Sequence, residues 1–236
     1  MRFAVISDLH FPSRKLRATA FVNAISTRQS VQFVVATGDL TDKGTDGGGV
    51  TACSCLSPLF KNGPGSKEDQ LGEYVECFEA PLRALGKKVY AVPGNSDVER
   101  VGCLAMSPVR DFLCGRYGNT HYVIERGGVK LVFCDVYPNA EVLAWMSLEL
   151  RFNVNPVIFF FHFNLVGENS DWWTQKEKDA FRDAIAGMRV LGIFVGHQHS
   201  SYAHTWYGYD VYCTGGENSW ATVVVNEDRS KLMVTF

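Results

Sequence analysis

The feature that most constrains this sequence is a set of short, apolar, β-rich runs that each lead into a polar residue able to bind a metal ion. Phe3 to Ile6 leads into Asp8 and His10, Val34 to Thr37 into Asp39, Tyr90 to Pro93 into Asn95, Val157 to Phe161 into His162, and Gly192 to Val195 into His197 and His199. In α/β sheets, ligands bind just beyond the carboxyl ends of strands, so these side chains are expected to converge. The pattern predicts one shared site.

The order of the runs also predicts a fold class. Strand-like segments at 3–6, 31–36, 88–92, 130–134, 157–161 and 190–195 alternate with helical periodicity at 14–27, 71–85, 140–150 and 174–188, as in layered α/β proteins. Tyr- and Val-rich runs after Ser200 predict antiparallel hairpins and so a mixed sheet or two facing sheets. We expect one domain over 1–236 with a Gly-rich loop insertion at about 43–70.

The chemistry of the predicted site follows from its residue types. Imidazole combined with carboxylate and amide oxygen suits manganese, iron or zinc, whereas an all-oxygen set suggests magnesium or calcium. Seven ligands are too many for one tetrahedral ion and fit two divalent ions ~3.5–4 Å apart that share a carboxylate. Taken singly, each residue has an ordinary structural explanation, such as a turn aspartate or a hydrogen-bonded core histidine. Five motifs together favour the two-metal interpretation.

The motifs DLH, GDLTDKG, PGNSD, a lone His162 after a strand, and GHQH resemble, in this order, those of the calcineurin-like metallophosphoesterases. Within that family, ISDLHF, TGDLTDKG and VPGNSD look most like the cyclic-nucleotide phosphodiesterase branch. The resemblance implies two mixed β-sheets flanked by helices. It also implies that Asp8, His10 and His199 hold a first ion, that Asn95, His162 and His197 hold a second, and that Asp39 bridges them.

The implied activity is phosphoester hydrolysis with a metal-bridging hydroxide as nucleophile, and Asp39, Asn95 and His162 are the candidate catalytic residues. The third motif departs from the family, because Ser96 replaces the histidine often assigned as general acid. We therefore expect a phosphodiesterase or a broad-specificity phosphoesterase. The alternatives are a phosphomonoesterase acting on a sugar, inositol or protein phosphate, and a non-catalytic metal-binding scaffold.

Several neighbouring residues leave two interpretations open. Asp97 is expected to be structural, and His121 and His204 are expected to be ordinary histidines outside the site. Trp172 or Trp173 either flanks the substrate or packs in the core. Arg14 and Lys15 either meet a phosphate or are simply solvated.

Composition narrows the possible partners and location. Lys and Arg (23) nearly balance Asp and Glu (25), so the sequence gives no strong nucleic-acid signal, and the expected partner is a small phosphoester substrate. The longest apolar run, 156–161, is far shorter than the ~20 residues that cross a bilayer. No signal-peptide pattern opens the chain, and seven irregularly spaced cysteines are typical of free thiols. We therefore expect a cytoplasmic protein; its oligomeric state is not predicted.

Overall fold

The computed structural model describes residues 1–42, 70–98, 107–167, 169–217 and 219–236. The predicted loop insertion at about 43–70 therefore lies outside the described residues, except for Gln70. The helices are α1 (Lys15–Ser26), α2 (Gln70–Tyr74), the π-helical turn η2 (Val75–Glu79), α3 (Ala80–Ala84), α4 (Pro108–Tyr117), α5 (Ala140–Glu149), the 3-10 turn η3 (Ser170–Trp172) and α6 (Gln175–Ile185). None of the helices in these ranges is long and apolar enough to cross a membrane.

Two mixed sheets form the centre of the fold. The first has the strand order β11 (Leu232–Thr235), β10 (Ala221–Val225), β1 (Arg2–Ile6), β2 (Phe33–Thr37) and β3 (Lys88–Val92). The second has the order β4 (His121–Arg126), β5 (Val129–Cys134), β6 (Val157–Phe160), β7 (Val190–Val195), β9 (Tyr209–Thr214) and β8 (Ser201–Trp206). β1, β2 and β3 run parallel, as do β5, β6, β7 and β9.

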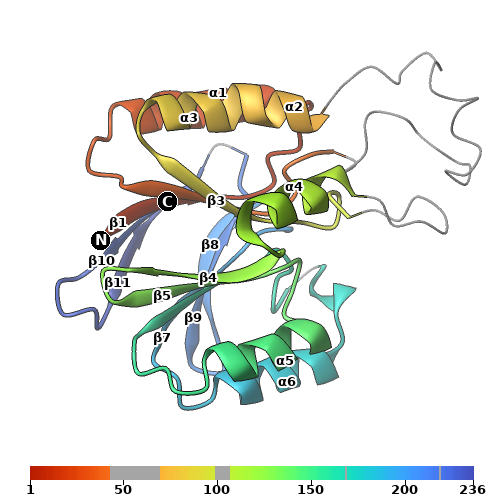
Figure 1. Ribbon diagram of the computed structural model, residues 1–236, viewed down its shortest axis with the longest axis vertical. Coiled ribbons are helices and arrows are strands. Elements are labelled where there is room, and N and C mark those ends of the chain that lie inside the picture. Colours follow the sequence, from red (N-terminus) through yellow and green to blue (C-terminus); the bar gives the residue numbers. More distant parts are fainter. Residues whose placement is uncertain (43–69, 99–106, 168, 218) are drawn as a thin grey trace, which may run out of the picture.

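The sheets face each other and helices cover their outer faces, which gives four layers (Figure 1). Between the sheets lies an aromatic core in which Phe3 of β1 contacts Phe160 and Phe194 of the second sheet, with ring centroids 6.1 and 6.2 Å apart. α1 and α3 pack on the first sheet around Phe21 and Phe78. α5 and α6 pack on the second, where Phe181 contacts Phe159. The expected two mixed sheets flanked by helices are confirmed.

The C-terminal residues complete both sheets. β8 and β9 form an antiparallel hairpin at one edge of the second sheet, and β10 and β11 form another beside β1. This confirms the predicted hairpins. The predicted capping box is also present at the start of α6, where Thr174 and Glu177 satisfy each other's backbone N–H groups. The assignment of 1–236 to one domain stays a prediction.

Three elements, α4, β4 and the short turn η3, were not predicted, and one strand begins later than expected. α4 and β4 are absent from the predicted set, although Ser107 and Pro108 carry a helix-start signal: the Ser107 side chain accepts the Arg110 N–H, and Pro108 is the first helical residue. β2 begins at Phe33 rather than Val31, because the Val31 N–H closes the turn after α1 by donating to the Arg28 carbonyl.

Candidate metal centre

The carboxyl ends of β1, β2, β3, β6 and β7 bring the seven predicted ligands to one edge of the two sheets. The first cluster consists of Asp8, His10, Asp39 and His199. His10 Nε2 lies 3.0 Å from His199 Nε2, and the Asp8 carboxylate lies 3.4 Å from His199 Nε2. The second cluster consists of Asp39, His162 and His197, and Asn95 adjoins it, with its Oδ1 3.0 Å from His162 Nε2. His197 offers a ring nitrogen to the group formed with Asp39 and His162, whose ligand atoms all lie within 4.8 Å of one another.

Asp39 stands between the two clusters. Its Oδ2 lies 3.5 Å from His10 Nε2 and 3.4 Å from His162 Nε2. Its other oxygen, Oδ1, accepts the Ser96 backbone N–H at 2.8 Å. One oxygen therefore borders both clusters while the backbone holds the other.

The backbone turns sharply at the candidate ligands. Five of the seven have a left-handed φ, a conformation that costs a non-glycine residue free energy and that concentrates at functional sites: Asp8 (56°), His10 (43°), Asp39 (49°), His197 (70°) and His199 (48°). The glycines next to the ligands have no room for a side chain. A Cβ on Gly38 would lie 2.6 Å from His162 Nδ1, and one on Gly196 would lie 1.8 Å from Ser7 Oγ.

Hydrogen bonds on the side facing away from the two clusters orient several candidate ligands. His162 is completely buried, and its Nδ1 lies 2.9 Å from the Thr37 carbonyl, so Nε2 is the nitrogen left facing Asp39. The Asp8 carboxylate accepts the His197 backbone N–H at 3.1 Å. Asp42 lies 3.7 Å from His10 Nδ1 and occupies the same kind of outer position. These contacts fix which ring nitrogen points inward.

The electrostatics favour positive charge beside Asp39. Burial opposes ionisation of Asp39, yet the neighbouring His162 holds the pKa of this carboxyl well below its usual range. Burial likewise opposes charge on His162, but Asp39 outweighs it and raises the pKa of His162 to about 9. A metal ion at the same position competes with that proton, so metal binding releases it. Burial, assisted by His162, lowers the pKa of His197 to about 4, so its ring is neutral near pH 7.

Two further residues support the site but were not among the predicted site residues. Arg17 is buried, and its guanidinium donates to the Ser7 and Asp8 carbonyls of the first loop and reaches the Thr214 carbonyl at 3.4 Å. Arg17 precedes Phe21 by four residues and therefore lies on the same, apolar face of α1. A charged residue on that face is the sequence signal by which Arg17 could have been found. Gly215 is the second, because a Cβ there would lie 2.4 Å from Asp8 Oδ2.

The structure shows where the residues with two open interpretations lie. Arg14 Nη2 lies 3.0 Å from His199 Nδ1, whereas Lys15 is half-exposed and pairs with Glu73 at 3.7 Å. Trp173 is buried and Trp172 is exposed beside His197. Asp97 is buried and binds backbone rather than joining either cluster. His121 and His204 lie on β4 and β8 and belong to neither cluster.

Comparison with known proteins decides the family. A family model described as calcineurin-like phosphoesterase matches residues 1–201. The chain belongs to this family. It is therefore a metal-dependent phosphoester hydrolase, and the predicted resemblance to this family is confirmed, while the branch within the family stays a prediction. Among curated proteins, no sequence matches it.

Solved structures agree on the fold of this calcineurin-like phosphoesterase. A dimetal phosphatase from Danio rerio has a TM-score of 0.68 at 14% identity, with 99% of this chain and 98% of that chain covered. A protein from Thermus thermophilus has a TM-score of 0.54 at 13% identity, covering 99% and 97%. GAP50, the anchor in the inner membrane complex of Plasmodium, has a TM-score of 0.53 at 11% identity, covering 94% and 80%. At these identities the likeness concerns the fold.

The residues of this phosphoesterase fit the two-metal requirement of its family. His197 Nε2 is buried and has no hydrogen-bond partner among the described residues, which is costly unless an electron-pair acceptor meets it. The His10 and His199 nitrogens face each other at 3.0 Å beside the Asp8 and Asp39 carboxylates. Such a convergence of lone pairs suits bound cations.

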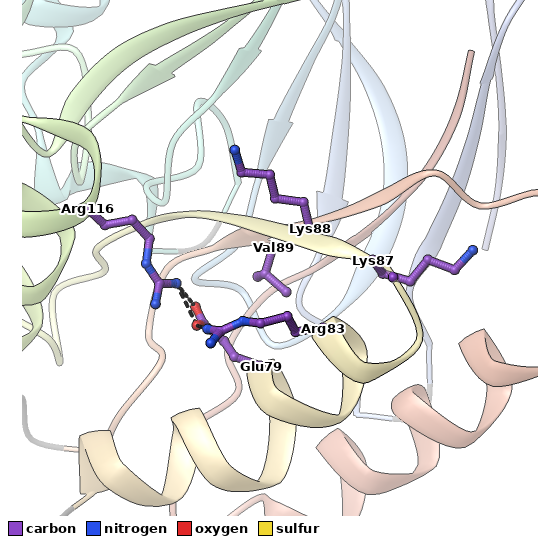
Figure 2. Close-up of a pocket in the computed structure, with 7 residues that line it drawn as sticks. Glu79, Arg83, Lys87, Lys88, Val89 and Arg116 are labelled. Atoms are coloured by element: carbon purple, nitrogen blue, oxygen red, sulfur yellow. Dashed lines mark hydrogen bonds and ion pairs between the residues drawn. The ribbon is translucent and has the colours of Figure 1, made fainter.

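A separate cavity of about 450 Å³ lies at the opposite end of β3, lined by Glu79, Arg83, Gly86, Lys87, Lys88, Val89 and Arg116. Its Arg side chains are already engaged: Figure 2 shows Arg83 and Arg116 turned toward the buried Glu79, and Arg116 Nη1 lies 2.6 and 2.5 Å from its two oxygens. The side chains of Lys87 and Lys88 extend away from this group. The cavity lacks convergent free donors, so we assign it no role in the phosphoesterase reaction.

Proposed function

We propose that this chain is a dinuclear phosphoesterase in which Asp39 bridges the two ions. Asp8, His10 and His199 complete the first site, and Asn95, His162 and His197 complete the second. The observation that carries the proposal is the position of Asp39 Oδ2, at 3.5 Å from His10 Nε2 and 3.4 Å from His162 Nε2. A single oxygen that borders both clusters is one of the two ways in which a carboxylate can bridge two ions ~3.5–4 Å apart.

The mixed donor set favours manganese, iron or zinc as the two ions. When bound, such ions polarise phosphoryl oxygens and lower the pKa of water toward ~7. The protein's part is to hold the ligands in place before the substrate arrives. Thr37 fixes the His162 ring through Nδ1, and Ser96 fixes Asp39 through its backbone N–H. Asp39, Asn95 and His162 are the residues we assign to the reacting phosphate.

We further propose a phosphodiesterase or a broad-specificity phosphoesterase. The support is Ser96, which stands where the family often has a histidine and whose hydroxyl donates to Asp39 Oδ2 at 3.1 Å. A hydroxyl engaged with a carboxylate is a poor proton donor to an alkoxide leaving group. A diester with a stable leaving group needs that proton least. A phosphomonoesterase is the alternative, and for it the leaving-group proton must come from another group.

The proposed substrate is a small phosphoester, and the proposed location is the cytoplasm. The location is supported by the described cysteines, since Cys77, Cys114, Cys134 and Cys213 are free thiols. The test of function is a hydrolysis screen of protein loaded with manganese, iron or zinc against nucleotide diesters, aryl diesters, lipid phosphodiesters and sugar monophosphates. Preferential turnover of diesters supports the proposal. Turnover of alkyl monoesters alone would assign the phosphomonoesterase instead.

A further inference from the structure

Two adjacent tryptophans beside the candidate metal centre have opposite exposures. Trp172 ends η3 with 55% of its surface exposed, whereas Trp173 is 2% exposed. The Trp172 ring centroid lies 5.0 Å from that of His197 and 5.6 Å from that of Phe163. Trp172 therefore presents an open aromatic surface in contact with a candidate ligand of the second site.

Trp173 anchors this segment. Its indole Nε1 donates to the Asn164 carbonyl at 3.0 Å, and its ring packs against Tyr137 and Phe161. The next residue, Thr174, caps α6. The core-packing role left open in the sequence thus belongs to Trp173. Trp172 is held beside the site without being needed to fill the core.

We propose that Trp172 is a stacking platform that selects phosphoesters carrying a planar aromatic ring. This inference rests on the proposed function, because it takes the phosphate to bind at the candidate metal centre, where the His197 ring contacts Trp172. A planar group stacks on an indole face, and a fixed, rigid ring loses little conformational entropy on binding. Phe163, a second hydrophobic ring against His197, is only 5% exposed and so offers little surface.

The ring could be an aryl group or a nucleobase, which share this chemistry. Three diesters with the same leaving group separate the sources: bis(p-nitrophenyl) phosphate, thymidine 5′-(p-nitrophenyl) phosphate and methyl p-nitrophenyl phosphate. p-Nitrophenolate leaves in each case. The kcat/KM for a diester whose retained group carries a ring, divided by that for the methyl ester, therefore reports the effect of the retained group. The ratio for Trp172→Ala should fall about 5- to 20-fold relative to wild type.

Two further variants control the comparison. Trp172→Phe keeps a ring and should retain most of the selectivity. Tyr207→Ala removes another exposed aromatic residue, in the turn that follows β8, and should leave all ratios unchanged. A loss confined to the thymidine ester assigns a nucleobase, and a loss on both esters assigns planar rings in general. Unchanged ratios together with an unchanged kcat/KM for the methyl ester in Trp172→Ala would overturn the platform, whereas an equal loss on all three esters would place the departing p-nitrophenyl ring on Trp172.

A binding measurement separates failure of this inference from failure of the proposed function. Phenylphosphonate and methylphosphonate cannot be hydrolysed, and their affinities for the metal-loaded protein can be measured by calorimetry. Wild type should bind phenylphosphonate more tightly than methylphosphonate, and Trp172→Ala should remove about the same 5- to 20-fold advantage. Wild type that hydrolyses none of the diesters contradicts the proposed function, while the phosphonates still decide the role of Trp172. Equal affinities in wild type would overturn it.

Discussion

The buried Asp97 carboxylate accepts both the backbone N–H and the hydroxyl of Thr41, each at 2.9 Å. It also accepts the N–H groups of Leu40 at 3.0 Å and Gly94 at 2.8 Å. One side chain therefore joins the loop after β2, which carries Asp39, to the loop after β3, which carries Asn95. The two halves of the proposed second site depend on this junction for their spacing.

Replacing Asp97 should consequently disturb both stability and metal binding. Asp97→Ala removes the carboxylate that accepts the backbone N–H groups of Leu40, Thr41 and Gly94, and an unsatisfied buried donor costs ~1–3 kcal/mol. We expect the free energy of unfolding to fall by at least ~2 kcal/mol and the metal affinity to fall about 10- to 100-fold, as for other outer-shell partners. Urea unfolding and metal titration measure the two effects. Asp210→Ala, an exposed carboxylate on β9, is the control. Equal behaviour of the two variants would contradict the structural role.

Asp39 should be needed for both ions rather than for one. Asp39→Asn keeps the size of the side chain but removes the charge that borders both clusters. We expect both bound ions to be weakened and turnover to fall more than about 100-fold, the upper end for loss of an outer-shell partner. Metal analysis of the purified variant, beside Asp210→Asn, tests this. A variant that retains one ion at full affinity would show that the carboxylate is not shared.

Gly94 should tolerate no side chain. A Cβ there would lie 2.1 Å from Asp39 Oδ1 and 2.2 Å from the Asp39 backbone nitrogen, so Asp39 must move. Overpacking of this kind costs ~1–3 kcal/mol, and we expect Gly94→Ala to lower metal affinity as well. Gly115→Ala is the matched control, because Gly115 lies in α4 with no heavy atom within 4 Å of its added Cβ. It should stabilise the protein by about 0.5–1 kcal/mol. Similar thermal unfolding curves for the two variants would refute the steric explanation.

These contacts show how much of the site can be predicted from the sequence. The seven ligand candidates are visible because metal-binding residue types follow apolar runs, and the carboxyl ends of parallel strands must meet at one edge. The bonds of Asp97 and Arg17 are not visible in this way, since both residues act on backbone groups distant in sequence. The different roles of Trp172 and Trp173 are not visible either, because the sequence does not tell which of the two adjacent rings packs into the layer outside the second sheet. β4 was not predicted, because its intermediate and exposed positions give a weaker apolar signal than the buried strands do.

His204 should make stability pH-dependent. Both of its ring nitrogens are buried without a hydrogen-bond partner among the described residues, and burial lowers its pKa. The unfolded chain therefore takes up a proton near the usual pKa of ~6.5 while the folded chain does not, so stability is lost as the pH falls below that value. His204→Gln should lose less stability than wild type between pH 7.5 and 5. Urea unfolding of the two metal-loaded proteins at several pH values tests this. If their free energies of unfolding changed in parallel with pH, His204 would be excluded as a source of the pH dependence.

Ser96 provides the sharpest test of substrate class. Its hydroxyl donates to Asp39 Oδ2 at 3.1 Å, and a hydroxyl is a far weaker acid than an imidazolium, whose pKa of ~6.5 suits proton donation near neutral pH. A positioned acid is typically worth ~10²–10⁴-fold, and alkyl monoesters with poor leaving groups depend on it most. We expect wild type to prefer activated diesters, and Ser96→His to raise monoesterase activity relative to diesterase activity.

The measurement compares wild type, Ser96→His and Ser96→Ala on bis(p-nitrophenyl) phosphate and on an alkyl monophosphate. Ser96→Ala is the matched control, because it removes the hydroxyl without adding an acid, and it should not gain monoesterase activity. The backbone N–H of residue 96, which donates to Asp39 Oδ1 at 2.8 Å, is available in all three proteins, so Asp39 keeps that contact. Efficient hydrolysis of the alkyl monoester by wild type, without a gain in Ser96→His, would mean that another group supplies the proton. Ser96 would then carry no information about the ester class, and the phosphomonoesterase alternative would be favoured.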